Sequence, residues 1–232
     1  MDHFQNIYAN HADEYDRLVS VEDYQGNLLP AISKVTPLAE KRVVEMGAGT
    51  GRVTRLLAPH VKSIHAFDGS AAMIKVAGQT LREMGLTNWK ADVADNRSIP
   101  LDDDSFDIAI EGWSFAHSVA WHPDTWRDEI GVMMGEMERI LRPGGTMILL
   151  ETLGTGYESP HLPNDGLAIL YAWWQWEKGM NATWVRTDLK YENVEHAAHS
   201  LGFFFGEEFG ERVRREQLTI VPECTGLWWR TV

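Results

Sequence analysis

The hydrophobic positions of this chain change their period several times, and these changes mark out its elements. From about residue 40, short apolar runs alternate with segments in which apolar residues recur every three or four positions. Residues 42–46, 63–67, 88–91, 106–110 and 146–150 are the apolar runs that predict buried strands. Strands that alternate with helices form a parallel, doubly wound sheet through right-handed crossovers. The pattern therefore predicts an α/β fold.

The flanks of the chain lie outside this alternation. Residues 4–36 predict two helices, and the second covers 21–35. Residues 152–187 contain several glycines and prolines before an aromatic-rich helix near 167–178, and they are too long for a simple connection. We expect one domain over residues 1–232, divided into a helical cap (1–38), a core (40–151), a lid or substrate-pocket insertion (152–187) and a C-terminal helix with strands (188–232).

The C-terminal part gives weaker signals. A helix over 193–201 is expected to end at Gly202, and residues 218–222 predict a strand. The three phenylalanines at 203–205 fit either a strand or another element, so this choice stays open. We expect residues 222–226 to form a loop.

Composition limits the class of protein. The chain has 232 residues, of which 44% are apolar and 24% charged, and this is typical of a single globular α/β domain. It contains no apolar run of eighteen residues and no basic-then-apolar leader, so we expect a cytoplasmic protein without a membrane partner. The single cysteine, Cys224, allows no internal disulfide and no thiolate metal cluster, and we expect no metal.

The net charge adds one more limit. It is −13 at pH 7, and an acidic surface repels phosphate backbones. We therefore expect no nucleic-acid partner.

The first strand of the alternating region runs into a glycine-rich turn. Residues 43–51 read Val-Val-Glu-Met-Gly-Ala-Gly-Thr-Gly, and a helical pattern begins at Arg52. Glycine lets the backbone bend sharply and approach a ligand at distances that a Cβ would prevent. A strand, a glycine turn and a helix N-terminus in this order predict a seat for a nucleotide-like ligand.

The glycine spacing and the neighbouring acids narrow the ligand. A dinucleotide fingerprint is Gly-x-Gly-x-x-Gly, and its third glycine would fall at Arg52; the Gly-Lys-Ser/Thr of a P-loop is also missing. Instead Glu45, Asp68 and Asp92 end three successive strands, at the edge where open parallel sheets bind ligands. Asp68 is placed to take ribose hydroxyls and Asp92 an adenine amino group. Carboxylates repel pyrophosphate, so a nucleoside without phosphate fits better.

Five motifs in order resemble those of class I S-adenosylmethionine-dependent methyltransferases. They lie at residues 45–51, 68–70 with Met73, 91–93, 106–110 and 141–145. The resemblance covers about residues 40–151, and within the class the chain is similar to the small-molecule branch that contains quinone-biosynthesis C-methyltransferases. It implies a Rossmann-like, doubly wound, mostly parallel sheet of seven strands, with helices on both faces and an antiparallel last strand.

The resemblance also implies S-adenosylmethionine as the cofactor, with S-adenosylhomocysteine as its product. The glycines of the turn at residues 47–51 would pass under the methionine part of the cofactor. Asp68 would hold its ribose, Met73 would pack on its adenine, and Asp92 would face the adenine amino group. Glu111 and Gly112 would border the transferred methyl group. The residues expected to bind the cofactor are Glu45, Gly47, Ala48, Gly49, Gly51, Asp68, Gly69, Met73, Asp92, Val93, Glu111 and Gly112.

The acceptor side is less defined. In-line transfer from a sulfonium needs alignment of the acceptor above all, and it needs a base only if the acceptor must lose a proton. His117, after the fourth strand, is the candidate base because His titrates near neutral pH, and a structural role is its alternative. The candidates for the acceptor pocket are Tyr8, Tyr15, Trp113, His117, Trp173 and Trp176.

Missing motifs narrow the reaction. Residues 111–114 are Glu-Gly-Trp-Ser, without the Asn/Asp-Pro-Pro-Tyr motif of amino-methylating enzymes that act on DNA and protein glutamine, and the only cysteine is Cys224. We therefore expect methyl transfer to an oxygen, nitrogen or carbon atom of a small molecule. Two alternatives stay open: a non-catalytic regulator that binds S-adenosylmethionine on the same fold, and a nicotinamide-dependent oxidoreductase, against which Arg52 argues. The acceptor and the oligomeric state are left open.

Overall fold

A computed structural model describes residues 2–232 of the chain, which form one large sheet, flanking helices and a small second sheet. The first half contains α1 (His3–Asn10), α2 (Ala12–Ser20), α3 (Leu28–Val35), β1 (Arg42–Met46), α4 (Arg52–Leu57), η1 (Ala58–His60), β2 (Ser63–Asp68), α5 (Ala71–Glu83), β3 (Trp89–Val93) and β4 (Phe106–Gly112). The second half contains α6 (His117–Trp121), α7 (Trp126–Ile140), β5 (Leu141–Thr155), α8 (Asp165–Trp176), β6 (Asn181–Arg186), β7 (Leu189–Lys190), α9 (Val194–Phe205), α10 (Glu207–Glu216), β8 (Ile220–Val221) and β9 (Glu223–Thr231).

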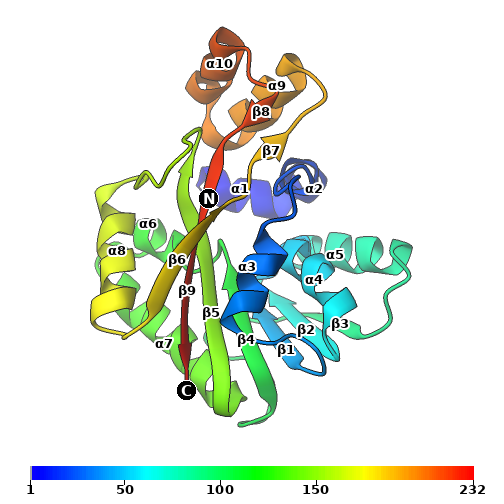
Figure 1. The fold of residues 1–232 in the computed structure, drawn as a ribbon, viewed down its shortest axis with the longest axis vertical. Coiled ribbons are helices and arrows are strands. Elements are labelled where there is room, and N and C mark those ends of the chain that lie inside the picture. The colour runs from blue at the N-terminus through cyan, green and yellow to red at the C-terminus, as the bar shows by residue number, and fades with distance from the viewer. Residues whose placement is uncertain (1) are drawn as a thin grey trace.

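The large sheet has seven strands in the order β3-β2-β1-β4-β5-β9-β6 (Figure 1). The pairs from β3 to β5 are parallel, whereas β9 is antiparallel to both β5 and β6. The strand order reverses between β1 and β4, and an open α/β sheet binds ligands at such a switch point. The expected fold, with its single antiparallel strand, is confirmed.

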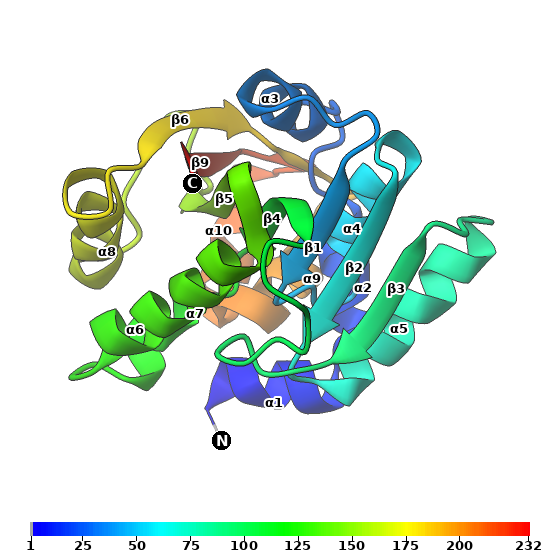
Figure 2. The same cartoon turned by 90° about the horizontal axis from the view of Figure 1, so that it is seen from below.

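Two hydrophobic layers cover the faces of the sheet. Val43 and Val44 are adjacent on β1 but belong to different layers, because successive side chains on a strand point to opposite faces. One layer packs β-strand side chains against α7 and α8, and the other packs them against α3 and α4. Figure 2 shows α7 and α3 on opposite sides of the sheet. The turns at the carboxyl ends of the strands are thereby held in fixed positions.

The N-terminal segment departs from the expected two helices. The structure has three, because the backbone leaves helical geometry at His11 and again between α2 and α3. In that second break Asp23 and Gly26 adopt positive φ angles, and the Asp23 carboxylate accepts hydrogen bonds from the backbone N–H groups of Asn27 and Leu28. The prediction of one helix over 21–35 was wrong because this turn interrupts its hydrophobic pattern.

The C-terminal segment also differs from the sequence pattern. Residues 203–205 complete α9, which ends at Gly206 with a φ of 99° and not at Gly202. The strand expected over 218–222 shortens to β8, which pairs with β7 in the small sheet. The expected loop over 222–226 is the beginning of β9, the long antiparallel strand.

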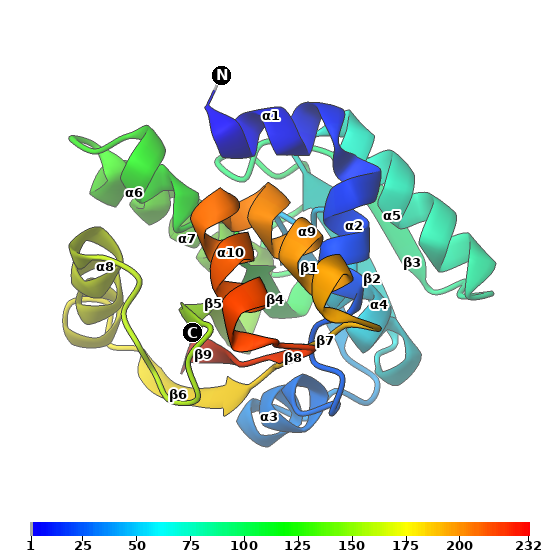
Figure 3. The same ribbon diagram turned by 90° about the horizontal axis from the view of Figure 1, so that it is seen from above.

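Residues 152–187 contain the end of β5, α8 and β6, so much of this segment belongs to the body of the fold. A separate layer instead comes from α9 and α10, inserted between β6 and β9, which lie with α1 and α2 across the carboxyl edge of the sheet (Figures 1 and 3). Phe4 and Tyr15 pack against Phe204, which joins the two helical pairs. Of the helical cap expected over residues 1–38, α3 packs on the face of the sheet instead. From here on, the cap means the four helices α1, α2, α9 and α10.

Candidate cofactor and acceptor site

The glycine turn after β1 has the geometry that its sequence predicts. Gly47, Gly49 and Gly51 all have positive φ angles, of 72°, 55° and 84°. A Cβ at Gly47 would lie only 2.1 Å from Oγ of Ser114, so the loop after β4 approaches this turn too closely for any other residue. The turn is therefore a bare backbone cradle at the switch point of the sheet.

Asp68, the last residue of β2, binds the glycine turn through its carboxylate. Its Oδ2 accepts a hydrogen bond from the Gly49 N–H at 2.8 Å, and its Oδ1 accepts one from the Ser70 N–H at 2.7 Å. Burial raises the pKa of this carboxyl, while the two N–H groups lower it. Each carboxylate oxygen retains a free lone pair, so Asp68 can also accept hydrogen bonds from a diol.

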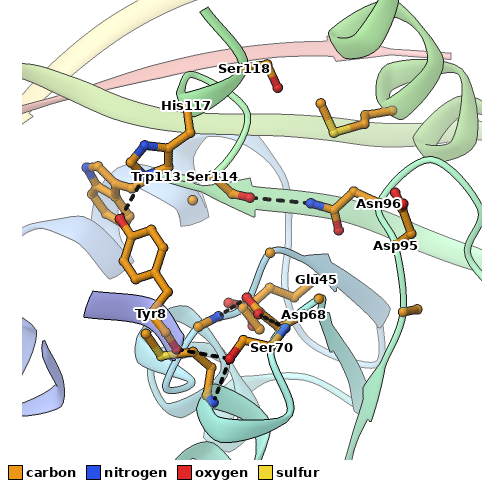
Figure 4. A pocket seen from close by; sticks show the side chains of 18 of the residues that line it. Tyr8, Glu45, Asp68, Ser70, Asp95, Asn96, Trp113, Ser114, His117 and Ser118 are labelled. Carbon is orange, nitrogen blue, oxygen red and sulfur yellow. Dashed lines mark hydrogen bonds between the residues drawn. The ribbon is translucent and has the colours of Figure 1, made fainter. Parts of the chain in front are cut away.

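A cavity of about 730 Å³ opens above the cradle. Its floor comes from the ends of β1, β2 and β4, and its walls come from α1, from the loop after β3 and from the loop and helix after β4. Figure 4 shows Tyr8 and His117 on one side of this space and Asp95 and Asn96 on the other, with Asp68 between them. The volume lies within the range of small-molecule sites.

Most of the residues expected at the site line this cavity. The expected cofactor residues that do so are Glu45, Gly47, Ala48, Gly49, Asp68, Gly69, Met73, Val93 and Gly112. The expected acceptor residues that do so are Tyr8, Tyr15, Trp113 and His117. The structure thus gathers residues from β1, β2, β4, α1 and α2 around one space.

Five expected residues lie elsewhere. Gly51 caps α4, and a Cβ there would lie 3.1 Å from that of Ala77. Glu111 is buried behind the cavity wall. Asp92 on the edge strand β3 has a side chain 62% exposed and bonds to His65 at 2.7 Å. Because side chains alternate along β3, the Asp92 side chain points toward His65 and away from the cavity.

Trp173 and Trp176 are also away from the cavity. Trp173 is buried against Trp126 of α7, in the layer under the sheet. Trp176 is 84% exposed at the end of α8. They lie three positions apart on α8, which packs on the sheet beside β9 and not over the cradle.

The structure adds lining residues that the sequence did not identify. Thr50 Oγ1 and Asn96 Oδ1 are buried in the cavity wall and have no hydrogen-bond partner among residues 2–232. Buried polar atoms are almost always paired, so these two mark places where a ligand would donate hydrogen bonds. Thr50 sits inside the glycine motif and could have been read from it, whereas Asn96 lies in a loop with no pattern of its own.

Arg52 closes the wall beside the cradle. Its guanidinium lies 3.4 Å from the ring centre of Trp113 and forms an ion pair with Glu22. The residue that replaces the third dinucleotide glycine is therefore itself a wall of the cavity.

Tyr8 and His117 join the cap to the loop after β4. Tyr8 Oη lies 2.7 Å from His117 Nε2, and Ser70 Oγ donates a hydrogen bond to the Tyr8 carbonyl at 3.0 Å. The His117 ring also stacks on Trp121. Burial lowers the pKa of His117 to about 4, so the imidazole is neutral at pH 7. Helix α1 is thus tied to both walls of the cavity.

Within residues 2–232, no helix has both the length and the apolar composition to cross a bilayer. No group of three or more His, Cys, Asp or Glu side chains in this range is arranged to hold a metal ion.

Comparison with known proteins agrees with the resemblance to methyltransferases found in the sequence. Residues 43–145 match the model of a methyltransferase domain. The chain is 32% identical over 111 residues to the uncharacterized protein YafE of Escherichia coli, and this match covers 48% of the chain and 49% of YafE. It is 28% identical over 155 residues to the demethylmenaquinone methyltransferase of Geobacillus stearothermophilus, covering 64% and 61% of the two chains.

A solved structure shares the fold. The YcgJ protein of Bacillus subtilis superimposes with a TM-score of 0.59 at 18% identity, over 88% of this chain and 97% of that one. With YafE, the matching region spans about half the length of the relative.

Fold and site define a Rossmann-like domain with a seat for a nucleoside cofactor that carries no pyrophosphate. The domain model matches residues 43–145, and the relatives include a demethylmenaquinone methyltransferase, so this part of the chain is similar to the class I S-adenosylmethionine-dependent methyltransferases. S-adenosylmethionine fits the seat, because the backbone of the glycine turn borders the cavity and Asp68 lines it with oxygen lone pairs that can accept from a diol. The resemblance read from the five motifs is confirmed.

Proposed function

We propose that this protein transfers a methyl group from S-adenosylmethionine to an oxygen, nitrogen or carbon atom of a small molecule by in-line displacement. The cofactor, held by the cradle, Asp68 and Met73, supplies the methyl group on a sulfonium. The observation that carries the proposal is the Tyr8–His117 contact, which closes the end of the cavity opposite Asn96. One cavity thus has a nucleoside end and a separate end for an acceptor.

The walls of the acceptor end favour a flat or apolar molecule. Tyr8, Trp113 and Trp121 line it, and aromatic rings offer large apolar faces with few hydrogen-bonding atoms. Several relatives are named demethylmenaquinone methyltransferases, and their name supports a ring-containing acceptor of the quinone type.

The Tyr8–His117 pair gives a path for a proton from the acceptor. In the proposal the Tyr8 hydroxyl donates to His117 Nε2, which is therefore not free to meet the acceptor directly. An acceptor X–H would pass its proton to Tyr8 Oη while the Tyr8 proton moves to Nε2. Methyl transfer then leaves X–CH₃, the neutral thioether and a protonated His117, so charge and atoms balance.

A panel of acceptors tests the activity. The protein is incubated with methyl-labelled S-adenosylmethionine and hydroquinones, phenols or amines, and S-adenosylhomocysteine and the labelled product are measured together. We expect product with at least one ring-containing acceptor. Tight cofactor binding without turnover on any member would favour the non-catalytic regulator instead.

Variants test the proton path. For an acceptor that loses a proton, His117→Gln should lower kcat by about 100-fold or more, the usual contribution of a general base, while cofactor affinity stays unchanged. Tyr8→Phe should lower kcat similarly. Trp176→Phe, at an exposed residue away from the cavity, is the control. Equal activity in His117→Gln and the control would contradict the base role.

A further inference from the structure

Two buried carboxyls lie under the loop that follows β4. Glu111 lies near the end of β4 and Glu151 lies within the longer paired strand β5, and both are buried. Glu111 Oε2 accepts hydrogen bonds from the backbone N–H groups of Ser114 at 3.2 Å and Phe115 at 3.3 Å. Glu151 Oε1 accepts one from Ala116 at 3.0 Å. Three successive N–H groups of the loop thus point at two acids.

These acids have no cation of their own. Neither takes part in a salt bridge within residues 2–232, and Glu111 Oε1 is buried without any hydrogen-bond partner in the same range. The titratable groups on which their charges act are phenols: Tyr8 on α1 and Tyr15 on α2 beside Glu151, and Tyr171 on α8 beside both acids. Glu45 and Asp68, on β1 and β2, line the cavity beyond them. The nearby bases are Arg52, which is paired with Glu22, and the neutral His117.

Burial makes ionisation of the pair costly. It raises the pKa of Glu151 to about 8, and burial together with the charge of Glu151 raises the pKa of Glu111 well above its usual range. At neutral pH both carboxyls are therefore largely protonated in the free protein. A positive charge brought into the cavity would lower both pKa values, because opposite charges favour the ionised form.

The two forms of the cofactor differ by such a charge. S-adenosylmethionine carries a sulfonium, whereas S-adenosylhomocysteine has a neutral thioether at the same place. Gly112, the next residue after Glu111, lines the cavity at the end of β4. The inference rests on the proposed function, because it takes the sulfonium to lie beside Gly112.

We propose that Glu111 and Glu151 select the cationic cofactor over its neutral product, by releasing a proton to solvent when the sulfonium binds and regaining it after the methyl group has left. The affinity that the ionised carboxylates add for the sulfonium would then be lost when the methyl group is transferred. The spent cofactor would be held less tightly than the fresh one, and product inhibition would weaken as pH rises.

Calorimetry tests this selection. Kd values for S-adenosylmethionine and S-adenosylhomocysteine are measured from about pH 6 to about pH 9. The preference should rise by about tenfold per pH unit for each proton released, and the share of Glu151 should level off above about pH 8, where that carboxyl is already ionised in the free protein. Glu111→Gln and Glu151→Gln should each remove the part of this pH dependence that one proton supplies, and the double variant should remove both parts. Comparing each variant with the unaltered protein cancels the titration of the ligands' own amino groups.

Asp107→Asn is the matched control. Asp107 is a buried acid on the same strand, four residues and about 13 Å before Glu111, at the opposite edge of the sheet. Its loss should leave the pH dependence of the preference intact. A loss equal to that in Glu111→Gln would show a nonspecific effect of removing a buried charge and would overturn the proposal.

Infrared difference spectra of the unaltered protein give a readout that needs no variant. The band of protonated carboxyls should weaken when S-adenosylmethionine binds and stay constant when S-adenosylhomocysteine binds. Equal spectra for both ligands, or a preference that does not change with pH, would overturn the selection while leaving the methyltransferase activity untouched. A protein that binds neither ligand would overturn the proposed function as well.

Discussion

At the scale of single residues, two acids that look equivalent in the sequence have different surroundings. Asp68 and Asp92 both end a strand, but only Asp68 faces the cavity and bonds to the glycine turn. Asp68→Ala should weaken S-adenosylmethionine binding by roughly 1.5–3 kcal/mol, the usual value of hydrogen bonds to a charged group. This corresponds to a rise in Kd of about 10-fold to 150-fold, measurable by calorimetry.

Asp92→Ala is the control for this change, because it removes an exposed carboxylate that pairs with His65. It should leave the Kd close to that of the unaltered protein. An equal loss in both variants would contradict the placement of Asp92, and no loss in Asp68→Ala would contradict the role of Asp68.

The sequence could identify Asp68 and the glycines because turn chemistry is local: positive φ angles and a strand end are visible in neighbouring residues. It could not separate Asp68 from Asp92, since the direction of a side chain on an edge strand depends on what the adjacent strand offers, here His65. Asn96 was missed for a similar reason, because its position depends on the Ser114 hydroxyl, to which its Nδ2 donates a hydrogen bond at 3.3 Å.

At the scale of elements, α9 and α10 pack against each other through two facing glycines, and only one of them has no room for a side chain. A Cβ at Gly210 would lie 2.7 Å from the Ala198 carbonyl oxygen, whereas a Cβ at Gly202 would meet its nearest atom at 3.6 Å. Gly210→Ala should therefore push α9 and α10 apart and lower the free energy of unfolding by about 1–3 kcal/mol. Chemical denaturation measures this change.

Gly202→Ala provides the matched substitution in the facing helix. It should be neutral or stabilise the protein by up to about 1 kcal/mol, because alanine favours helix and the contact there has ordinary spacing. A free energy of unfolding that is lower in Gly202→Ala than in Gly210→Ala would contradict this packing. The sequence predicted that Gly202 ends a helix, because a helix-ending glycine and a packing glycine look alike until the facing helix is known.

At the scale of the whole molecule, the parallel, doubly wound sheet followed from the alternating pattern, while the position of α9 and α10 over its carboxyl edge did not. These two helices interrupt the sheet between β6 and β9, and the contacts of α9 with α2 join segments about 180 residues apart. Such distant pairings leave no local pattern. They nevertheless cover the carboxyl edge, where several acids are buried.

These buried acids make the stability of the molecule depend on pH. Burial raises the pKa of Glu45, Glu151 and Glu223 to about 8, from an ordinary value of 4.5. The folded state therefore holds protons that the unfolded chain releases, and the stabilisation is fully present below about pH 4.5 and is lost as pH rises toward 8. The free energy of unfolding should fall from about pH 5 to pH 8, by up to about 1.4 kcal/mol per pH unit for each such group.

Urea denaturation across this range checks the slope, and Glu223→Gln checks its origin. Replacing one titrating carboxyl by a neutral amide should reduce the slope of the free energy of unfolding against pH by the contribution of one proton. Glu136→Gln should leave this slope unchanged. Glu136 pairs with Arg139, which lowers its pKa, so its contribution is lost only at acidic pH. A free energy of unfolding that rises between pH 5 and 8 would mean that the acids are ionised in the fold, and the proton-linked selection between the two cofactor forms would then lose its source.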